Sequence, residues 1–519
     1  MIRLLKEKLA DSVRADYEKR KHRAEADSDF RAYTEEETEQ WERRLPDKGC
    51  IPREEADRIR AARTREVSVS VIIPTKDHPE LLGRCVDALV RTIDPEKERV
   101  RYEIIVTDNG SSTENRKIIN EILDTAKGSS GPYDCRYLVQ TEEFHFSRMC
   151  NRGAAASGNE LLLFLNDDTE ADGAGWLSEL CAFALSEKAG AVGMKLCYPH
   201  KEGEVPRIQH CGVVNEFYGP VHVLSESPDD VRYFWDYTRT VRACVAVTGA
   251  CLMIRRELFL EQGGFCEELP VAFNDVDLCY TLYERGLRNL CCNTVHMLHH
   301  ESMSRGDDRK DDEKLLRLSR DLAILKKRHP RTFGRDPYFD ARLSTGPSIV
   351  PFTGGSDRLT GELARQRGRV FSPEASAYRH DACVHVNVEY AGRLRDGTDV
   401  RGTGQDEGAK DWLIRGFSFV AGADNALYTR RLLLQRLREE EDGSTSGEGK
   451  ILSFALTEEY RPDKALRFSD QCNCALGGFQ TRIGEEALAP GTYRIGIAAH
   501  KRYSRQKLYH WGVILLHAE

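Results

Sequence analysis

The stretch Glu160-Leu-Leu-Leu-Phe-Leu-Asn-Asp-Asp168 decides the fold class of this chain. A short apolar run with a polar residue at each end is typical of a strand that is buried on both faces of a sheet. Two similar runs precede it, Val67-Ser-Val-Ser-Val-Ile-Ile73 and Arg101-Tyr-Glu-Ile-Ile-Val-Thr107, and helical patterns separate the three. This alternation predicts an α/β fold with a Rossmann-like, mostly parallel sheet and helices on both of its faces.

The other parts of the chain differ in character from this region. At 519 residues the chain is long enough for two or three domains. We expect a charged N-terminal helical segment over residues 1–66, the α/β domain over 67–345 and a Gly- and Pro-containing linker over 346–370. Several short strands without helices between them predict a β-sandwich over residues 371–519.

The charge balance excludes some classes of function. The net charge is -8, so the basic field of a nucleic-acid-binding protein is missing. The sequence contains no apolar run long enough to span a membrane, and its first residues do not resemble a signal peptide, which predicts a cytoplasmic protein. The basic residues near the N-terminus leave two alternatives for the first helix: packing against protein, or peripheral contact with a membrane surface.

Polar residues follow the expected strands at one edge of the sheet, where ligands bind in folds of this class. Asn166-Asp167-Asp168 places two acids at a strand end, which suits a hard cation, although an aspartate there can also cap a helix. Asp108 begins an Asp-Asn-Gly turn and could accept a hydrogen bond from a nucleobase.

Two later motifs carry further candidates. The segment from Phe273 to Gly286 reads as a helix with Asp275 in its first turn, where the helix dipole favours an ionised carboxylate. A charge–dipole contact alone would also explain Asp275. His299 and His300 follow an apolar run, and a histidine at a strand end can either complete a metal site or serve structure.

In this order, the motifs resemble the family 2 glycosyltransferases with the GT-A fold, in the branch linked to O-antigen and cell-surface polysaccharide assembly and called rhamnosyltransferase-like. The resemblance covers about residues 67–335 and rests on seven stretches: SVIIPTKDHPELLGRCVDAL, EIIVTDNGSS, NRGAAASGNELLLFLNDDTE, RIQHCGVV, VTGACLMIRRELFLEQGGF, AFNDVDLCYTLYERG and LHHESMSRG. The C-terminal region looks like an accessory β domain of such enzymes.

The resemblance implies a role for each matching residue. Asp275 would be the catalytic base, although the glutamate that usually precedes it is Asn274 here. Asp168 would be the main metal ligand, with His299 as the helper histidine and His300 as its competitor. The implied nucleotide-binding residues are Pro74, Thr75, Asp108, Asn166 and Asp167, and those of the sugar and acceptor pocket are Trp176, Gly249, Ala250 and Asn274.

The implied activity is an inverting, metal-dependent transfer of a hexosyl or rhamnosyl group from a UDP-, dTDP- or GDP-sugar. Mg²⁺ or Mn²⁺ is the expected cofactor. The acceptor would be a hydroxyl of a growing cell-surface glycan, which a lipid can carry at the inner face of the cell membrane, and a homodimer is compatible with this picture. The alternative is a GT-A fold that only binds nucleotide or glycan. We disfavour a nucleotidylyltransferase, because the Gly-rich basic loop of that class does not follow the first strand.

Overall fold

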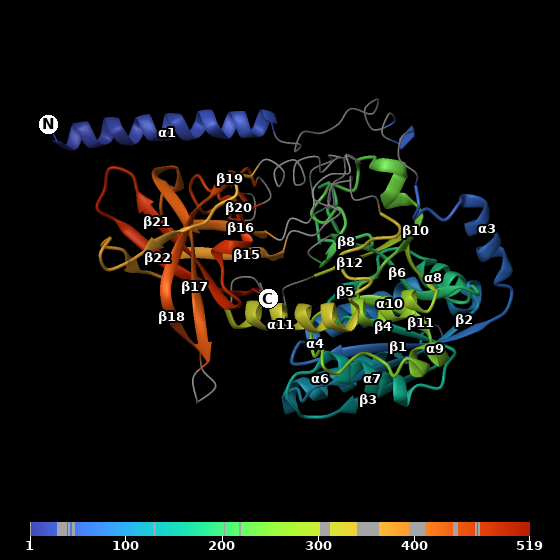
Figure 1. Cartoon of the computed structure of the whole chain (residues 1–519). Helices are drawn as coiled ribbons and strands as arrows, with labels where there is room; N and C mark the ends of the chain where they lie inside the picture. The colour runs from blue at the N-terminus through green and yellow to red at the C-terminus, as the bar shows by residue number, and fades with distance from the viewer. Residues whose placement is uncertain are drawn as a thin grey trace. The chain divides into compact units, whose positions relative to one another are not determined.

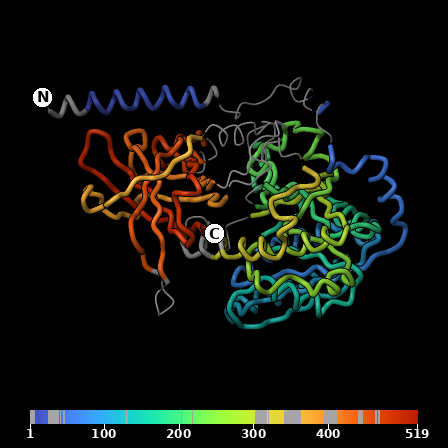
Figure 2. Tube along the Cα trace, in the orientation of Figure 1, coloured from blue at the N-terminus to red at the C-terminus, as the bar shows by residue number. Residues whose placement is uncertain are grey.

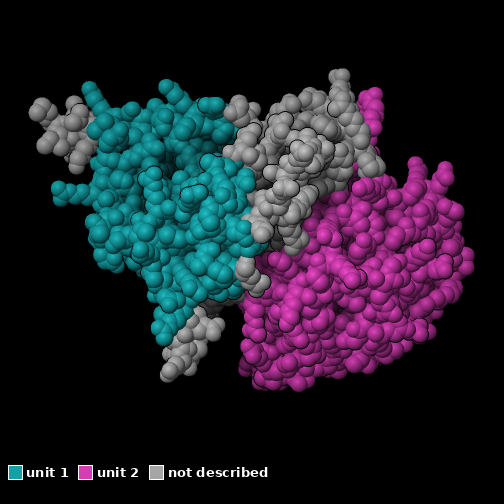
Figure 3. All heavy atoms as spheres, in the orientation of Figure 1, with its two compact units in different colours: residues 1–31, 352–519 teal, residues 32–351 magenta. Residues whose placement is uncertain are grey.

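A computed structural model of the chain forms two compact units, which Figure 3 colours separately: residues 32–351, and residues 1–31 together with 352–519. It describes residues 2–27, 39, 42–43, 47–127, 131–201, 203–216, 219–300, 312–339, 363–393, 411–439, 445–461, 464–465 and 468–518. Most of the expected linker, and residues 301–311 directly after His300, lie outside this set.

The unit of residues 32–351 is built on one large sheet with the strand order β10-β12-β6-β11-β4-β1-β2-β3 (Figure 1). Strands β5 and β7 join it by pairing with β12 and β6, and β8 and β9 form a separate hairpin. The strands are β1 (Val67–Thr75), β2 (Val100–Asp108), β3 (Asp134–Val139), β4 (Leu161–Leu165), β5 (Thr169–Glu170), β6 (Ala189–Cys197), β7 (Ile208–His210), β8 (Val213–Glu216), β9 (Gly219–His222), β10 (Val241–Cys244), β11 (Cys251–Arg255) and β12 (Arg288–His299).

The sheet is mixed in direction. Strands β4, β1, β2 and β3 run parallel, and so do β12 and β6. Strand β11 is antiparallel to both of its neighbours, β4 and β6, and β10 is antiparallel to β12. The predicted α/β class is confirmed, and the antiparallel β11 has a consequence for the site: it brings the start of β11 to the edge where the parallel strands end.

Helices cover both faces of this sheet, as predicted. Alternate residues of β1 face opposite cores: Val71 and Ile73 contribute to one, and Ile72 to the other. The first core takes side chains from α3 (Arg53–Ala62), α4 (Pro79–Thr92), α6 (Thr113–Ala126) and α8 (Trp176–Ala184). The second takes them from α7 (Phe146–Ala156), α9 (Arg256–Glu261), α10 (Asn274–Glu284) and α11 (Asp312–Arg328). Shorter helices are α5 (Pro95–Glu98) and η1 (Phe234–Arg239).

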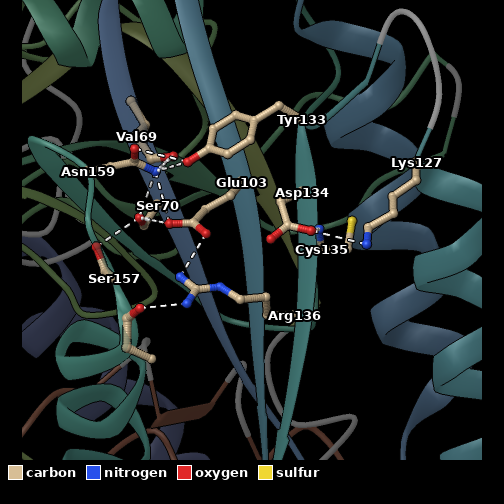
Figure 4. A network of polar contacts seen from close by, with 11 residues as sticks. Val69, Ser70, Glu103, Lys127, Tyr133, Asp134, Cys135, Arg136, Ser157 and Asn159 are labelled. Carbon is tan, nitrogen blue, oxygen red and sulfur yellow. Dashed lines mark hydrogen bonds and ion pairs between the residues drawn. The ribbon is translucent and has the colours of Figure 1, made fainter.

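A buried polar network joins the amino-terminal halves of β1, β2 and β3 (Figure 4). Its centre is Glu103, which is 4% exposed. The Glu103 carboxylate accepts hydrogen bonds from Ser70 Oγ at 2.5 Å, Arg136 Nη2 at 2.7 Å and Asn159 Nδ2 at 2.9 Å. Because a buried charge is costly unless it is paired, these contacts fix the register of three strands at the end away from the polar strand tips.

Replacing the centre of this network should destabilise the unit. Glu103→Leu removes the charged acceptor of Arg136 and Asn159, which keep only the backbone oxygens of Ala156 and Val69 and neutral hydroxyls, and we expect a loss of about 1–3 kcal/mol in the free energy of unfolding. Glu103→Gln keeps an acceptor oxygen and should cost less. Chemical denaturation of both variants measures the difference, and equal stabilities would show that the carboxylate is not the centre of the network.

A segment before β1 is fastened to the free edge of the sheet. Ile51 N donates to Val241 O at 2.9 Å, which extends the sheet beyond β10. Asp47 binds the Arg242 guanidinium through both of its oxygens, with Oδ2 2.9 Å from Nη1. Arg242 is 1% exposed and also lies over the ring of Tyr237, 4.4 Å from its centroid. The ion pair with Asp47 offsets the cost of burying the Arg242 guanidinium, and it holds the segment before β1 against β10.

The second unit contains two sheets, as the sequence predicted for the C-terminal region. One has the order β13-β18-β17-β21-β22-β14 and the other β15-β16-β20-β19, and side chains from both form one core. The strands are β13 (Arg369–Phe371), β14 (Arg379–His380), β15 (Val384–Arg393), β16 (Trp412–Val420), β17 (Tyr428–Glu439), β18 (Thr445–Ala455), β19 (Thr457–Glu459), β20 (Gly478–Ile483), β21 (Gly491–Lys501) and β22 (Lys507–Ala518), with short helices η3 (Asn425–Leu427) and η4 (Glu485–Ala487).

Helix α1 (Ile2–Asp27) packs on these C-terminal strands, although nearly the whole sequence separates them (Figure 2). Val13 and Tyr17 are buried, and Tyr17 Oη accepts a hydrogen bond from Leu476 N at 3.3 Å. Arg14 Nε donates to Asp424 Oδ2 at 2.7 Å. The sequence left two alternatives for this helix, packing against protein or contact with a membrane surface. The face that carries Val13 and Tyr17 packs against protein. In the part of the chain that is described, no helix is long and apolar enough to cross a membrane.

Candidate active site

The site is built where β4 ends and β11 begins. Leu165 and Cys251 are paired in the two antiparallel strands, so the residues just beyond them meet at the same edge. Asn166 N donates to Ala250 O at 3.0 Å, and this bond holds the Asn166-Asp167-Asp168 turn against the segment Gly249-Ala250. The polar tip predicted after β4 is therefore fixed by main-chain contacts.

Strand β12 brings His299 to this turn. His299 Nε2 lies 3.1 Å from Asp168 Oδ1 and 3.4 Å from Asn166 Nδ2. His300 also lies close, but its backbone N–H donates to Asp168 O at 2.8 Å and its ring lies 3.3 Å from Glu170 Oε2. Of the two predicted histidines, His299 is the one whose ring faces Asp168.

The chemistry of these groups fits a hard divalent cation. The side chain of Asp168 offers carboxylate oxygens beside the His299 imidazole. Asn166 Oδ1 is buried and accepts no hydrogen bond from any described residue, so it is an oxygen in need of a partner. No three acidic, histidine or cysteine side chains converge within the described ranges, so oxygens from a ligand or water would have to complete the coordination. Mg²⁺ and Mn²⁺ are the ions that such a mixed set suits.

Asp275 lies on the other side of Gly249. It stands in the first turn of α10 and is half-buried. Its Oδ2 accepts from Gly249 N at 2.6 Å and its Oδ1 from Val276 N at 2.8 Å. Burial raises the pKa of the Asp275 carboxyl above the ordinary aspartate value, and the two backbone hydrogen bonds oppose that rise. A carboxylate with a raised pKa and a partly open surface can accept a proton.

The neighbours of Asp275 in α10 serve structure. Asn274 is 2% exposed and its amide donates to Val271 O at 3.3 Å, so it does not face an open pocket. Asp277 accepts hydrogen bonds from Arg328 Nε at 2.5 Å and His329 Nε2 at 3.0 Å. Burial opposes the charge of Asp277, but these hydrogen bonds outweigh it and hold its pKa below the ordinary value. Asp277 thus ties α10 to the end of α11.

The predicted nucleotide-binding residues lie at the carboxyl ends of β1, β2 and β4, and all of them except the half-buried Asn166 are buried. Thr75 Oγ1 donates to Asp167 Oδ2 at 2.6 Å, which links two strand ends, and Pro74 lies within β1. Asp108 is 0% exposed, and its carboxylate accepts from Ser111 Oγ at 2.7 Å and from Tyr137 Oη. In this arrangement the Asp108 carboxylate orders the turn after β2, and a base could reach it only if Tyr137 moved.

Trp176 is not brought to the site. It is 2% exposed in the core beneath the sheet, and its indole N–H donates to Thr92 Oγ1 at 3.1 Å. Trp176 is the first residue of α8 and is packed in the hydrophobic core, where large aromatic side chains are commonly found. Its expected place in a sugar pocket is therefore corrected, whereas Gly249 and Ala250 do lie between Asp275 and Asn166.

Three polar residues near the site were not singled out from the sequence. Gln209 Oε1 lies 2.5 Å from His299 Nδ1, and Gln209 is 5% exposed. His210 is buried, and its Nδ1 lies 3.3 Å from His222 Nδ1. His222 is exposed and near enough to Asp275 for its charge to lower the pKa of that carboxyl. Gln209 and His210 belong to the RIQHCGVV stretch, whose residues had no assigned role.

Two curated proteins are similar to part of this chain. An uncharacterized protein, y4gI, of Sinorhizobium fredii is 35% identical over 281 residues, which are 53% of this chain and 29% of that protein. The O-antigen biosynthesis protein RfbC of Myxococcus xanthus is 35% identical over 248 residues, 46% of this chain and 18% of that protein. The chain thus spans less than a third of the length of these two relatives.

Among solved structures, the mannosyltransferase PcManGT of Pyrobaculum calidifontis, in complex with GDP-Man and Mn²⁺, aligns with a TM-score of 0.37 at 15% identity, over 51% of this chain and 65% of that one. GalNAc-T7 with UDP, GalNAc and Mn²⁺ aligns with a TM-score of 0.40 at 12% identity, over 76% and 72% of the two chains. Residues 70–260 match the model of the glycosyl transferase family 2, and this segment holds the site residues from Pro74 to Ala250.

Proposed function

We propose that this chain is an inverting, metal-dependent glycosyltransferase that moves a sugar from a nucleotide-sugar donor to a hydroxyl of a growing cell-surface glycan. The match of residues 70–260 to glycosyl transferase family 2 and the similarity to an O-antigen biosynthesis protein support the reaction class. The proposal extends to residues beyond that match, because Asp275 and His299 follow it in the sequence.

One observation carries the proposal: a continuous line of contacts joins a candidate base to a candidate cation site. Gly249 N binds Asp275, and Ala250 O binds Asn166 N. Asn166 in turn lies beside His299 and Asp168. Two adjacent residues, Gly249 and Ala250, therefore join the group that can accept a proton to the groups that can hold a cation, which supports a reaction that uses both groups on one bound substrate.

In the proposed reaction, Asp275 accepts the proton of the acceptor hydroxyl as that oxygen attacks the anomeric carbon. The bond from that carbon to the diphosphate oxygen breaks, and the configuration inverts. A bound Mg²⁺ or Mn²⁺, held by Asp168 and His299 with Asn166, would stabilise the negative charge of the leaving group. The N–H groups of Gly249 and Val276 orient the Asp275 carboxylate without giving it a charged partner.

The donor would be a UDP-, dTDP- or GDP-sugar that carries a hexosyl or rhamnosyl group, with Pro74, Thr75, Asp108 and Asp167 at the nucleotide side. A lipid-linked acceptor would bring the chain to the inner face of the cell membrane from the cytoplasm. A homodimer is part of the same proposal. These assignments rest on the family resemblance, so the first experiment should identify the donor.

The decisive experiment is nucleotide release from a panel of nucleotide-sugars, with Mn²⁺, Mg²⁺ or EDTA. We expect release from one donor, loss of that release in EDTA, and its return when Mn²⁺ is restored. Asp168→Asn should reduce metal-dependent release by at least tenfold, since it removes a charged ligand. Metal-independent release would contradict the cation site. Tight donor binding with no release, even when glycan acceptors are supplied, would favour the binding-protein alternative.

A further inference from the structure

The ring of His299 is held from behind by a residue that no motif marks. Gln209 lies in β7, the short strand that pairs with the end of β6, and its side chain is buried. Its Oε1 lies 2.5 Å from His299 Nδ1. An amide oxygen can only accept a hydrogen bond, so Nδ1 must carry the proton in this contact.

The opposite nitrogen of the same ring faces the site. His299 Nε2 lies 3.1 Å from Asp168 Oδ1 and 3.4 Å from Asn166 Nδ2. The ring itself is 10% exposed, and protein surrounds it. With the proton at Nδ1, the neutral form of the ring has its lone pair at Nε2, and a cation bound between Nε2 and the Asp168 carboxylate is what would make that contact favourable. The direction of that lone pair is thus set from β7, not from the site itself.

We infer that Gln209 is a positioning residue, which fixes the tautomer and the orientation of His299 so that Nε2 is presented to a divalent cation beside Asp168. This inference rests on the proposed function for the identity of the cation. It does not depend on that function for the hydrogen bond between Gln209 and His299. Partners of this kind, behind a ligating histidine, commonly change metal affinity when they are replaced.

The same strand also reaches the side of Asp275. Gln209 O lies 3.3 Å from His222 Nδ1, and His210 lies against His222, with their ring centroids 4.9 Å apart. Burial, together with His222 and His299, lowers the pKa of His210 far below the ordinary histidine value, so His210 stays neutral. Strand β7 therefore holds one histidine near Asp168 through a side chain and another near Asp275 through its backbone.

The first measurement is made on the full-length protein without metal. Protein labelled with ¹⁵N-histidine is compared with its His299→Gln variant, which assigns the His299 ring signals. We expect wild-type His299 to carry its proton at Nδ1, and Gln209→Leu to shift the ring toward a mixture of tautomers. A wild-type His299 that is protonated only at Nε2 would overturn the inference, whatever the enzyme does.

The second measurement is the affinity for Mn²⁺ alone, read by electron paramagnetic resonance. Gln209→Leu should raise the Kd by about 10- to 100-fold, and Gln209→Glu, which keeps an acceptor oxygen, should not raise it. Gln480→Leu, another buried glutamine to leucine change but in the other unit, is the matched control and should leave the Kd unchanged. An unchanged Kd in a folded Gln209→Leu protein would contradict the inference. If wild type kept the Nδ1 proton but bound no Mn²⁺, the inference about the tautomer would stand and the proposed metal dependence would fail.

Discussion

Replacing Asp275 by asparagine should lower the rate of sugar transfer by about 10²- to 10⁴-fold, the usual contribution of a positioned general base. The amide keeps one oxygen, which can still accept from Gly249 N, and it loses the acceptor for Val276 N, so the size and position of the side chain change little. It cannot accept the proton of an attacking hydroxyl. Donor affinity should change little, because the groups proposed to hold the nucleotide lie at other strand ends.

The pH dependence tests the same residue. Burial raises the pKa of Asp275 above the ordinary aspartate value, and a base works only when it is deprotonated. The wild-type kcat/KM should therefore fall as the pH drops through this raised pKa, earlier than an exposed aspartate would allow. The acid limb should disappear in the residual activity of Asp275→Asn. If the limb stayed in place, another group would be the base.

Asp277 offers a matched control in the same helix. It is two residues away and binds Arg328 and His329 rather than facing the site. Asp277→Asn should lower the thermal midpoint and leave the transfer rate near that of wild type at temperatures where the protein is folded. Equal losses of activity in the two variants would mean that Asp275 acts through the stability of α10 and not through chemistry.

Removing Asp47 should destabilise the unit of residues 32–351 by about 3–5 kcal/mol, because it leaves the guanidinium of Arg242 buried without its partner. Arg242 is 1% exposed, and the contact with the Tyr237 ring cannot replace a carboxylate. Asp47→Ala should therefore unfold at a markedly lower denaturant concentration than wild type, as followed by circular dichroism.

The double variant Asp47→Ala with Arg242→Met separates a buried charge from lost packing. Replacement of both partners by apolar groups is often close to neutral, so most of the lost stability should return. If the double variant were as unstable as Asp47→Ala, the cost would lie in the anchoring of the segment around Cys50 and Ile51 to β10, and not in the unpaired guanidinium.

The strands of the α/β unit could be predicted because each is a short apolar run with a polar residue at its end. Val67–Thr75 and Leu161–Leu165 match the expected strands closely, and both are buried on both faces. The direction of β11 could not be predicted, because an apolar strand such as Cys251–Arg255 reads the same in a parallel or an antiparallel sheet. That direction is what brings Gly249 and Ala250 to the site.

The side-chain contacts of the site were less accessible to sequence reasoning. Asp275 and His299 could be singled out from the ends of a helix and a strand, but their distance from each other along the chain does not show what they touch. Gln209 was missed since an isolated glutamine in a short strand carries no pattern, and only the fold places it behind His299. Trp176 was misplaced because proximity in sequence to Asp168 does not determine the direction of a side chain.

The docking of α1 on the C-terminal strands has a consequence for how the chain is made. Val13 and Tyr17 are synthesised before the residues that bury them, because those residues belong to 352–519. The intervening residues 32–351 form the other unit. At about 5–20 residues per second, roughly 320 residues must be synthesised over a period on the order of 20–60 s before the first of those strands appears. During that time the α/β unit can already fold. The apolar face of α1 stays exposed to water and to chaperones until residues 352–519 have been synthesised.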